Sequence, residues 1–495
     1  MSLEMKIDIP AEGLGLRDPG LLETRCLIDG EWLGTAADAV HNPATGALLA
    51  SVPHFGAKEA TAAVEAAARA FKPWAKRIAK ERGAILRRWF ELIIENREDL
   101  ALILTAEQGK PLAEARGEID YAASYVEFYA EEAKRIYGET IPSHRPDARI
   151  MVARQPVGVV TAITPWNFPA GMITRKIAPA LAAGCTAVVK PAPETPLTAL
   201  ALAVLAKRAG IPAGVFNVIT GDAPAIGLVF TSHPAVRVVG FTGSTEVGKL
   251  LMRQAAAGVK KVALELGGNA PFIVFDDADV DAAVEGAMVS KFRNMGQTCV
   301  CANRLYVQAG IYDAFVERLA ERVQALVVGD GAAPGITQGP LITKDALAKV
   351  ERLVADATHK GATAVTGGRH HALGRTFYEP TVLAHVTAEM DVARQEIFGP
   401  VAPVFRFEHE DEVIAAANDT QYGLAAYFYA RDVGRIFRVA EALEYGMVGI
   451  NSGLLSSELV PFGGVKESGN SREGGRHGID EFVETKYMLI GGLDR

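Results

Sequence analysis

The stretch VGVVTAITPWNFP, residues 157–169, decides the fold class of this chain. It begins with apolar and β-branched residues and ends in a loop rich in proline and aromatic residues. Similar apolar runs follow at residues 186–190, 215–221 and 237–243, and a helical pattern separates each run from the next. Continuous apolar strands that alternate with helices indicate a parallel sheet covered on both faces, which is a dinucleotide-binding architecture.

A second alternating series begins near Asn269 and runs to GMVGIN at residues 446–451. It predicts a second α/β domain, which meets the first near residues 265–269. Ligand sites are common at such interfaces between domains. The predicted division has a dinucleotide-binding domain followed by a catalytic domain: residues 1–138 and 157–266, then residues 267–468.

Two long helical patterns, at about residues 57–77 and 80–135, are expected to pack against the first sheet. Residues 139–156 break the helical period, and RIMVARQ within them alternates as an exposed strand does. A second isolated strand, FVETKYMLIGG, lies at residues 482–492. Strands without local partners need a sheet edge, either within this subunit or on another subunit.

Composition restricts the function. With 495 residues the chain is too long for one core, and 49 % apolar with 22 % charged residues is typical of a globular protein. The net charge of −8 argues against nucleic acid or an anionic membrane as partner. Only four cysteines, no signal-like N-terminus and no apolar run of about 18 residues favour a soluble cytoplasmic protein. The histidines and cysteines show no zinc spacing, so no metal site is expected.

The candidate chemistry lies in FRNMGQTCVCANRLYV, residues 292–307, where a glycine, two amide side chains and two cysteines occur together. A thiolate attacks carbonyl carbon readily, and Cys299 is the predicted nucleophile. The alternative is a buried structural cysteine. The polar residues and Gly296 around Cys299 would make a poor core, which favours the catalytic interpretation.

FRNMGQTCVCANR resembles the nucleophile loop of the aldehyde dehydrogenases, and its Cys-x-Cys form is most similar to the succinate-semialdehyde dehydrogenases. The resemblance extends from NPATG, residues 42–46, to the end of the chain. It implies a Rossmann-type parallel-sheet cofactor domain, a second α/β catalytic domain and a β oligomerisation arm. The arm would comprise residues 139–156 and 469–495, and the protein would be a homodimer or homotetramer.

Two further residues complete the catalytic set that the resemblance implies. Asn167, in TPWNFP, would hold the oxygen of a tetrahedral adduct together with the backbone N–H of Cys299. Glu265, in LELGG, would activate water, and an apolar wall would raise the pKa of its carboxyl group. Cys299 would form a thiohemiacetal, hydride would pass to a nicotinamide, and water would hydrolyse the thioester. The alternatives are a turn residue for Asn167 and a solvated strand-end acid for Glu265.

The predicted cofactor is NADP or NAD. GSTEVG, residues 243–248, follows a strand and opens a helix, so it would bring backbone N–H groups to a phosphate, although it can also be an ordinary turn. By resemblance Lys190 would bind the adenosine ribose and Glu396 the nicotinamide ribose. Pro193 stands where members that prefer NAD often carry glutamate, which favours NADP despite Glu194. The other expected cofactor residues are Thr164, Pro165, Trp166, Gly243, Ser244, Gly248 and Phe398.

The predicted substrate is a small aldehyde with a distal carboxylate. By resemblance Arg175, Arg293 and Ser456 would hold that carboxylate, and guanidinium groups bind carboxylates bidentately. The alternative for the arginines is ion pairing or surface charge. Succinate semialdehyde is the expected substrate, and glutarate semialdehyde is the alternative. A cysteine esterase without redox chemistry would leave the nucleotide-binding half unexplained, and a catalytically silent protein would not need Cys299, Glu265 and Asn167.

Cys301 is the second cysteine of the loop. A pair of cysteines two residues apart can come within bonding range, although neighbouring side chains of an extended loop tend to point apart. We expect an oxidation-sensitive disulfide between Cys299 and Cys301, and the alternative is that Cys301 is a bystander thiol.

Overall fold

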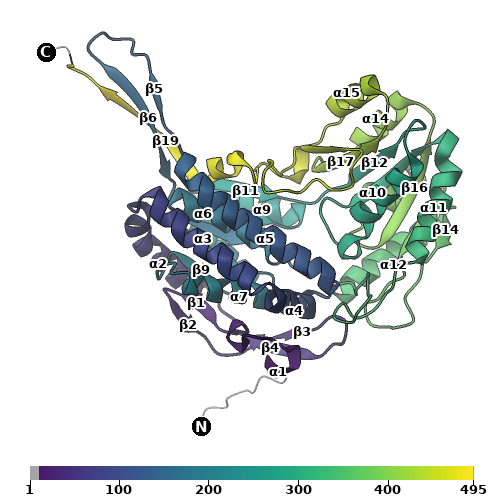
Figure 1. The fold of residues 1–495 in the computed structure, drawn as a ribbon, viewed down its shortest axis with the longest axis horizontal. Coiled ribbons are helices and arrows are strands. Elements are labelled where there is room, and N and C mark those ends of the chain that lie inside the picture. Colours follow the sequence, from purple (N-terminus) through teal and green to yellow (C-terminus); the bar gives the residue numbers. More distant parts are fainter. Residues whose placement is uncertain (1–10, 494–495) are drawn as a thin grey trace.

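Two seven-stranded sheets form the body of the chain (Figure 1). The structure is a computed structural model that describes residues 11–493. The prediction that the N-terminus has no signal sequence concerns mainly residues 1–10, which lie outside that range. The first sheet has the order β11-β10-β7-β8-β9-β1-β2. Its parallel strands are the predicted apolar runs: β7 (Val159–Ile163), β8 (Thr186–Lys190), β9 (Phe216–Val218), β10 (Val236–Thr242) and β11 (Lys261–Glu265). The antiparallel strands β1 (Cys26–Ile28) and β2 (Glu31–Leu33) complete it.

Helices cover both faces of this sheet. Both α2 (Ala57–Ala75) and α6 (Gly171–Ala183) contact β7 and β8. The connections after β8, β9 and β10 are α7 (Pro196–Arg208), α8 (Ala223–Ser232) and α9 (Thr245–Ala256), close to the predicted bounds.

The long helical pattern expected at residues 80–135 is three helices rather than one: α3 (Ala79–Glu95), α4 (Arg97–Gln108) and α5 (Leu112–Glu132). Gly109 ends α4 in the left-handed conformation with φ 92°, and Pro111 precedes α5. The apolar pattern continued across these breaks because all three helices bury residues in one core with α6 and α7.

The second sheet has the order β14-β15-β16-β13-β12-β17-β18. All of its strands are parallel except β14, and they are β12 (Ala270–Val274), β13 (Ala302–Gln308), β14 (Thr363–Thr366), β15 (Thr381–Ala384), β16 (Val401–Phe407), β17 (Ala425–Tyr429) and β18 (Met447–Ile450). Its main helices are α10 (Val280–Phe292), α11 (Tyr312–Gln324), α12 (Lys344–His359), α14 (Glu410–Asn418) and α15 (Val433–Ala442). One apolar core lies on each face of the sheet.

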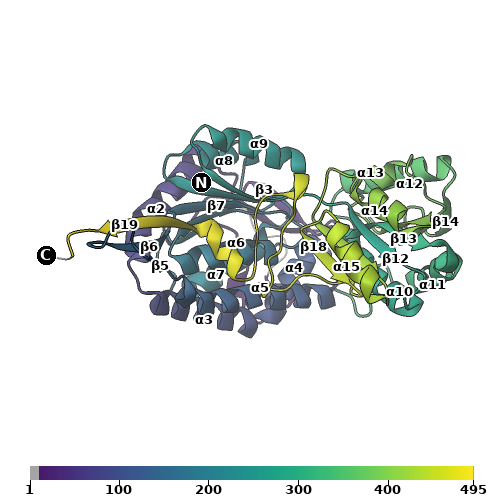
Figure 2. The ribbon, with the colours of Figure 1, turned by 90° about the horizontal axis from the view of Figure 1, so that it is seen from above.

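A three-stranded antiparallel sheet projects from the first unit, on the side away from the second (Figures 1 and 2). It consists of β5 (Glu139–Ile141), β6 (Arg149–Pro156) and β19 (Val483–Ile490). The two strands predicted to lack partners therefore pair with each other along eight residues each, from Val483 opposite Pro156 to Ile490 opposite Arg149. A hairpin of β3 (Asp38–His41) and β4 (Leu48–Val52) lies beside the first unit.

The C-terminal segment differs from the expected arm. Only β19 belongs to the projecting sheet, whereas residues 469–471 lie against the end of β11, where Gly469 forms a β-bridge with Glu265. Within residues 11–493, no helix combines the length and the apolar content required to cross a membrane.

Candidate active site

The nucleophile loop begins where α10 ends. A short 3-10 segment, η3 (Arg293–Gly296), contains two residues in the left-handed region, Asn294 with φ 49° and Met295 with φ 54°. The side-chain amide of Asn294 donates to the carbonyl oxygens of Asn167 (3.0 Å) and Gln297 (3.2 Å). Contacts of this kind hold strained backbone in place, as is common at functional sites. The loop therefore presents Cys299 in a fixed position.

Cys299 is half-buried and forms part of the walls of two cavities. The first, of about 290 Å³, is also lined by cofactor candidates: Pro165, Trp166, Gly243, Ser244, Glu396 and Phe398. The second, of about 310 Å³, is also lined by the three substrate candidates: Arg175, Arg293 and Ser456. The structure thus brings most of the predicted site residues together around one sulfur atom.

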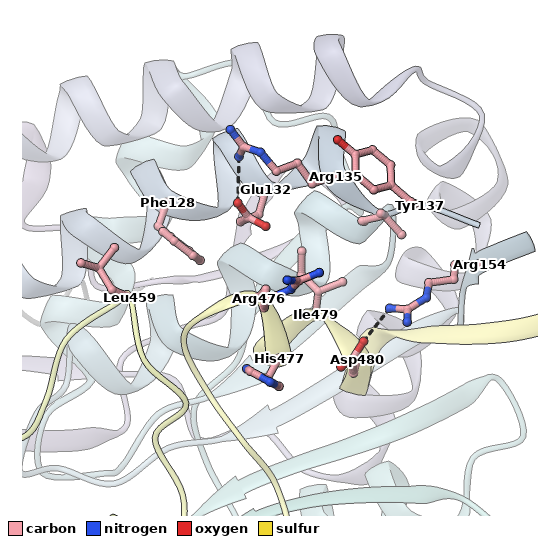
Figure 3. A pocket seen from close by; sticks show the side chains of 11 residues that line it. Phe128, Glu132, Arg135, Tyr137, Arg154, Leu459, Arg476, His477, Ile479 and Asp480 are labelled. Carbon is pink, nitrogen blue, oxygen red and sulfur yellow. Dashed lines mark hydrogen bonds and ion pairs between the residues drawn. The ribbon is translucent and has the colours of Figure 1, made fainter. Parts of the chain in front are cut away.

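A larger cavity, of about 630 Å³, lies elsewhere, at the base of the projecting sheet (Figure 3). Two ion pairs line it, Arg135 with Glu132 at 2.8 Å and Arg154 with Asp480 at 2.7 Å. None of the predicted catalytic, cofactor or substrate residues lines it. Size alone would therefore select the wrong cavity as the active site.

Asn167 lies in the loop after β7 and is buried. Its Nδ2 donates to the carbonyl oxygen of Gln297 at 3.0 Å, two residues before the nucleophile. One amide hydrogen is used in this bond, and the second remains for an oxyanion.

Two residues that the sequence analysis did not identify support the loop of Asn167. The buried Lys110 donates to the carbonyl oxygen of Asn167 (2.8 Å) and to Glu118 (2.6 Å). Both residues occur in ordinary helical sequence, which carries no signal for this role.

Glu265 ends β11 and is buried. The hydroxyl group of Ser471 donates to its Oε1 at 2.7 Å, whereas Oε2 has no hydrogen-bond partner within residues 11–493. Burial, and then the negative charge of Glu473, raise the pKa of Glu265 to about 8. The expected rise is therefore present, but a second carboxylate contributes to it as well as the apolar surroundings. Ser471 and Glu473 were both missed, because they were assigned to the arm.

Arg175 is buried, which excludes the surface-charge interpretation for this residue. Its Nη2 lies 2.5 Å from Oε2 of Glu473, and Lys176 also pairs with Glu473. Its guanidinium group stacks over the ring of Phe462, 3.9 Å from the ring centroid. Arg175 therefore already has an acid of the protein as its partner, which it shares with Lys176.

Arg293 differs from Arg175. It is half-buried, lies over the ring of Phe168 and has no ion-pair partner among residues 11–493. Glu114 lines the same cavity, but burial raises the pKa of its carboxyl group. Of the two arginines, Arg293 thus has the charge that remains available to an anion.

The cofactor side of Cys299 has an aromatic wall. The rings of Trp166 and Phe398 meet edge to face at 5.6 Å between centroids. Glu396 accepts a hydrogen bond from the backbone N–H of Gly268 at 3.0 Å, and burial raises the pKa of Glu396 to about 7. Ser244 caps α9, whose first turn opens beside the cavity. Thr242 also lines this cavity, and its buried hydroxyl group has no hydrogen-bond partner within residues 11–493. That hydroxyl group is therefore available for a hydrogen bond to a ligand.

Three predicted cofactor residues lie slightly apart from this wall. The hydroxyl group of Thr164 is buried without a hydrogen-bond partner in the described part of the chain. The backbone N–H of Thr164 donates to the carbonyl oxygen of Lys190 at 3.1 Å. Lys190 ends β8, and its Nζ donates to the carbonyl oxygen of Pro191. Gly248 has a packing role: a Cβ at this position would lie 2.4 Å from the side chain of Leu266. That the backbone at Gly248 also approaches a ligand stays a prediction.

The two loop cysteines face different surroundings. Cys301 is buried, and its thiol points to the carbonyl oxygens of Lys291 and Ala302, each at 3.5 Å. Cys299 faces the cavities, and both cysteines are free thiols. Burial raises the pKa of Cys299 to about 12, and the charge of Arg175 acts in the opposite direction. A disulfide between the two would require one sulfur to turn.

Two α/β sheets, with a cysteine between a cavity lined by the cofactor candidates and a cavity lined by two arginines, are the arrangement expected of an oxidoreductase that uses a cysteine nucleophile. The chain belongs to the aldehyde dehydrogenase family, whose model matches residues 32–488. It is 61 % identical over 480 residues to the succinate-semialdehyde dehydrogenase (NADP+) of Escherichia coli, covering 96 % of this chain and 99 % of that protein. It is 60 % identical over 481 residues to the glutarate-semialdehyde dehydrogenase of Pseudomonas aeruginosa, covering 97 % and 100 %.

Two further comparisons extend this result. A 3-sulfolactaldehyde dehydrogenase of Pseudomonas putida is 60 % identical over 485 residues, covering 97 % of this chain and all of that protein. The crystal structure of succinate-semialdehyde dehydrogenase from Burkholderia pseudomallei matches with a TM-score of 0.95 and 59 % identity, covering 96 % of this chain and 99 % of that chain. The predicted fold and family are confirmed.

Proposed function

We propose that this enzyme oxidises succinate semialdehyde to succinate with NADP or NAD. The observation that carries the proposal is the position of Cys299 on the walls of two cavities, one of which is lined by Arg293, a residue without an ion-pair partner among residues 11–493. The names of the three relatives support it as well, because each aldehyde carries an anionic group far from its carbonyl. Glutarate semialdehyde is the second candidate, since the relative that bears its name is as similar as the others.

The residues of the site divide the chemistry among them. Cys299 attacks the aldehyde carbon to give a thiohemiacetal, and the amide of Asn167 with the backbone N–H of Cys299 stabilises the oxyanion. A nicotinamide cofactor in the neighbouring cavity would supply the hydride acceptor for that carbon. Glu265 removes a proton from the water that attacks the resulting thioester, which releases the acid and restores Cys299. Arg293 and Ser456 hold the distal carboxylate.

The cofactor would lie in the cavity on the other side of Cys299. We propose that Lys190 and Glu396 contact its two riboses, and that Ser244 and the start of α9 face its phosphates. NADP is favoured over NAD because the exposed Pro193 brings no negative charge to the region of Lys190. The name of the Escherichia coli relative also includes NADP.

The domains and the arm have separate proposed roles. Residues 1–138 and 157–266 would bind the dinucleotide and residues 267–468 would supply the nucleophile. The projecting sheet exposes large apolar side chains on all three of its strands, and these would contact a second copy in a homodimer or homotetramer. They are Ile141, Met151, Tyr487, Met488, Leu489 and Ile490. A reducing compartment such as the cytoplasm would keep Cys299 in the thiol form.

Absorbance of the reduced nicotinamide, recorded after the protein is mixed with NADP or NAD and an aldehyde, tests the proposal. Succinate semialdehyde should give a far higher kcat/KM than uncharged butanal, and glutarate semialdehyde should fall between them. Equal values for the three aldehydes would contradict the substrate assignment. Ester hydrolysis without any cofactor reduction would favour the esterase alternative.

A further inference from the structure

Ser471 contacts the proposed general base but was expected in the arm. It lies in the C-terminal segment 469–475, two residues after the β-bridge between Gly469 and Glu265. It is 1 % exposed, and its hydroxyl group lies 2.7 Å from Oε1 of Glu265. The carbonyl oxygen of Leu264 is a second acceptor at 3.2 Å. A segment distant in sequence thus supplies a hydrogen-bond donor to the base.

A hydroxyl group has a single hydrogen, so Ser471 can donate to only one of these two oxygens at a time. The bond to Oε1 is the shorter, and a bond to a charged acceptor is the stronger kind. If a proton were placed on Oε1, Ser471 would have to turn to the carbonyl oxygen of Leu264. If the proton is placed on Oε2, the bond from Ser471 to Oε1 persists unchanged.

We propose that Ser471 is a positioning residue: its hydroxyl group fixes Oε1 of Glu265, so that Oε2 is the oxygen that takes the proton from the attacking water. Oε2 is buried and has no hydrogen-bond partner within residues 11–493, as an atom reserved for water requires. The inference rests on the proposed function, because it concerns the water-activating step. In that step the water oxygen bonds to the thioester carbon, one proton of the water passes to Oε2, the C–S bond breaks, and Cys299 leaves as the thiolate.

Other charged groups face Glu265. The acid Glu473 comes from the same C-terminal segment, Arg175 and Lys176 come from α6, and Cys299 comes from the nucleophile loop. Burial and Glu473 raise the pKa of Glu265, whereas Arg175, Ser471 and Lys176 lower it. Ser471 carries no charge, so replacing it leaves the local charge unchanged.

The test compares Ser471→Ala, Ser471→Thr and Ser471→Val in the full-length enzyme. Threonine and valine have the same shape and differ in the hydroxyl group, so this pair carries the test if the alanine variant does not fold. The acylated enzyme is formed with succinate semialdehyde and cofactor, quenched at set times, and its decay is followed by mass spectrometry from pH 6 to 10. Hydride transfer is followed separately as the first burst of reduced nicotinamide.

A hydrogen bond to a charged group is worth about 1.5–3 kcal/mol, which equals about one to two pH units. We therefore expect Ser471→Ala and Ser471→Val to move the midpoint of the decay by about one unit to higher pH. At pH 7 the decay should slow by about tenfold. The burst rate and KM should stay as in the wild type, and Ser471→Thr should restore the midpoint.

Ser468→Ala is the matched control. Ser468 is also a buried hydroxyl of this region, but it bonds only to the backbone, accepting from Gly423 N–H at 2.9 Å and donating to the Gly267 carbonyl at 2.7 Å. Its loss should lower the melting temperature without moving the pH midpoint. An unchanged midpoint in Ser471→Val, or equal shifts in the threonine and valine variants, would overturn the inference.

Glu265→Gln separates this inference from the proposed function. If Glu265→Gln gives the burst and then stalls while Ser471→Val behaves as the wild type, only the role of Ser471 fails. If Glu265→Gln turns over normally, the assignment of Glu265 as the base fails, and the role of Ser471 fails with it.

Discussion

Nη2 of Arg175 and Oε2 of Glu473 lie 2.5 Å apart in an ion pair that is almost fully buried. The pair joins α6, which follows the Asn167 loop, to the C-terminal segment that also contacts Glu265. It gives one of the two arginines expected to bind the substrate a partner within the protein. The affinity for an anionic aldehyde should therefore depend most on the other arginine.

Arg293→Ala should raise KM for succinate semialdehyde by about 10- to 100-fold, because a hydrogen-bonded charge pair is worth about 1.5–3 kcal/mol. KM for butanal should change little, since butanal has no carboxylate. Steady-state kinetics of the variant with both aldehydes measures the two effects. Equal increases for both substrates would contradict the role of Arg293 in binding the carboxylate.

Turnover should rise with pH through a midpoint near 8. The pKa of Glu265 is raised to about 8, and only the ionised carboxylate, which predominates above that pKa, can accept a proton from water. The decay rate of the acylated enzyme, measured between pH 6 and 10, reports this midpoint. A rate that is constant across pH 7–9 would show that a different group is the base.

Lys110→Met should destabilise the enzyme. Lys110 and Glu118 form a buried ion pair at 2.6 Å, and removal of one partner from such a pair costs about 3–5 kcal/mol. Denaturant unfolding measures the loss. Adding Glu118→Gln should recover part of it, because glutamine still accepts from the backbone N–H of Ala170 without leaving an uncompensated charge. No recovery in the double variant would mean that the charge of Glu118 is not the cause.

Pro193→Glu should reduce the preference for NADP. A carboxylate at this position would repel a 2′-phosphate in the region of Lys190, whereas the ribose hydroxyls of NAD would not be repelled. The ratio of Kd values for the two cofactors, obtained by titration, should shift toward NAD by about tenfold. Pro193→Gln, which adds similar bulk without the charge, is the control and should leave the ratio close to the wild type.

Peroxide should inactivate the wild type through a disulfide if Cys299 and Cys301 can meet. In that reaction two thiols and one peroxide give one disulfide and two waters, so the count of four free thiols falls to two. Reductant should restore activity, and Cys301→Ser should lose this reversibility. A thiol count that stays at four during inactivation would exclude the disulfide.

Much of the architecture could be predicted from local patterns. The apolar runs at residues 157–163 and 186–190 identified β7 and β8, because a strand buried on both faces must be apolar throughout. Helix breaks were less visible: α3, α4 and α5 read as one helix because they share one core. Gly109 ends α4 through its left-handed backbone, which the apolar period alone does not reveal.

By itself, the sequence determined the family, the two α/β units and the choice of Cys299, Asn167 and Glu265 as predicted catalytic residues, because motif order and apolar period are local properties. Only the tertiary structure decided which charges are matched. It pairs Arg175 with Glu473, leaves Arg293 without an ion-pair partner among residues 11–493, and brings Ser471 to Oε1 of Glu265. Hydrogen bonds and ion pairs act over a few ångströms in space, and no spacing along the chain encodes that a C-terminal segment returns to the end of β11.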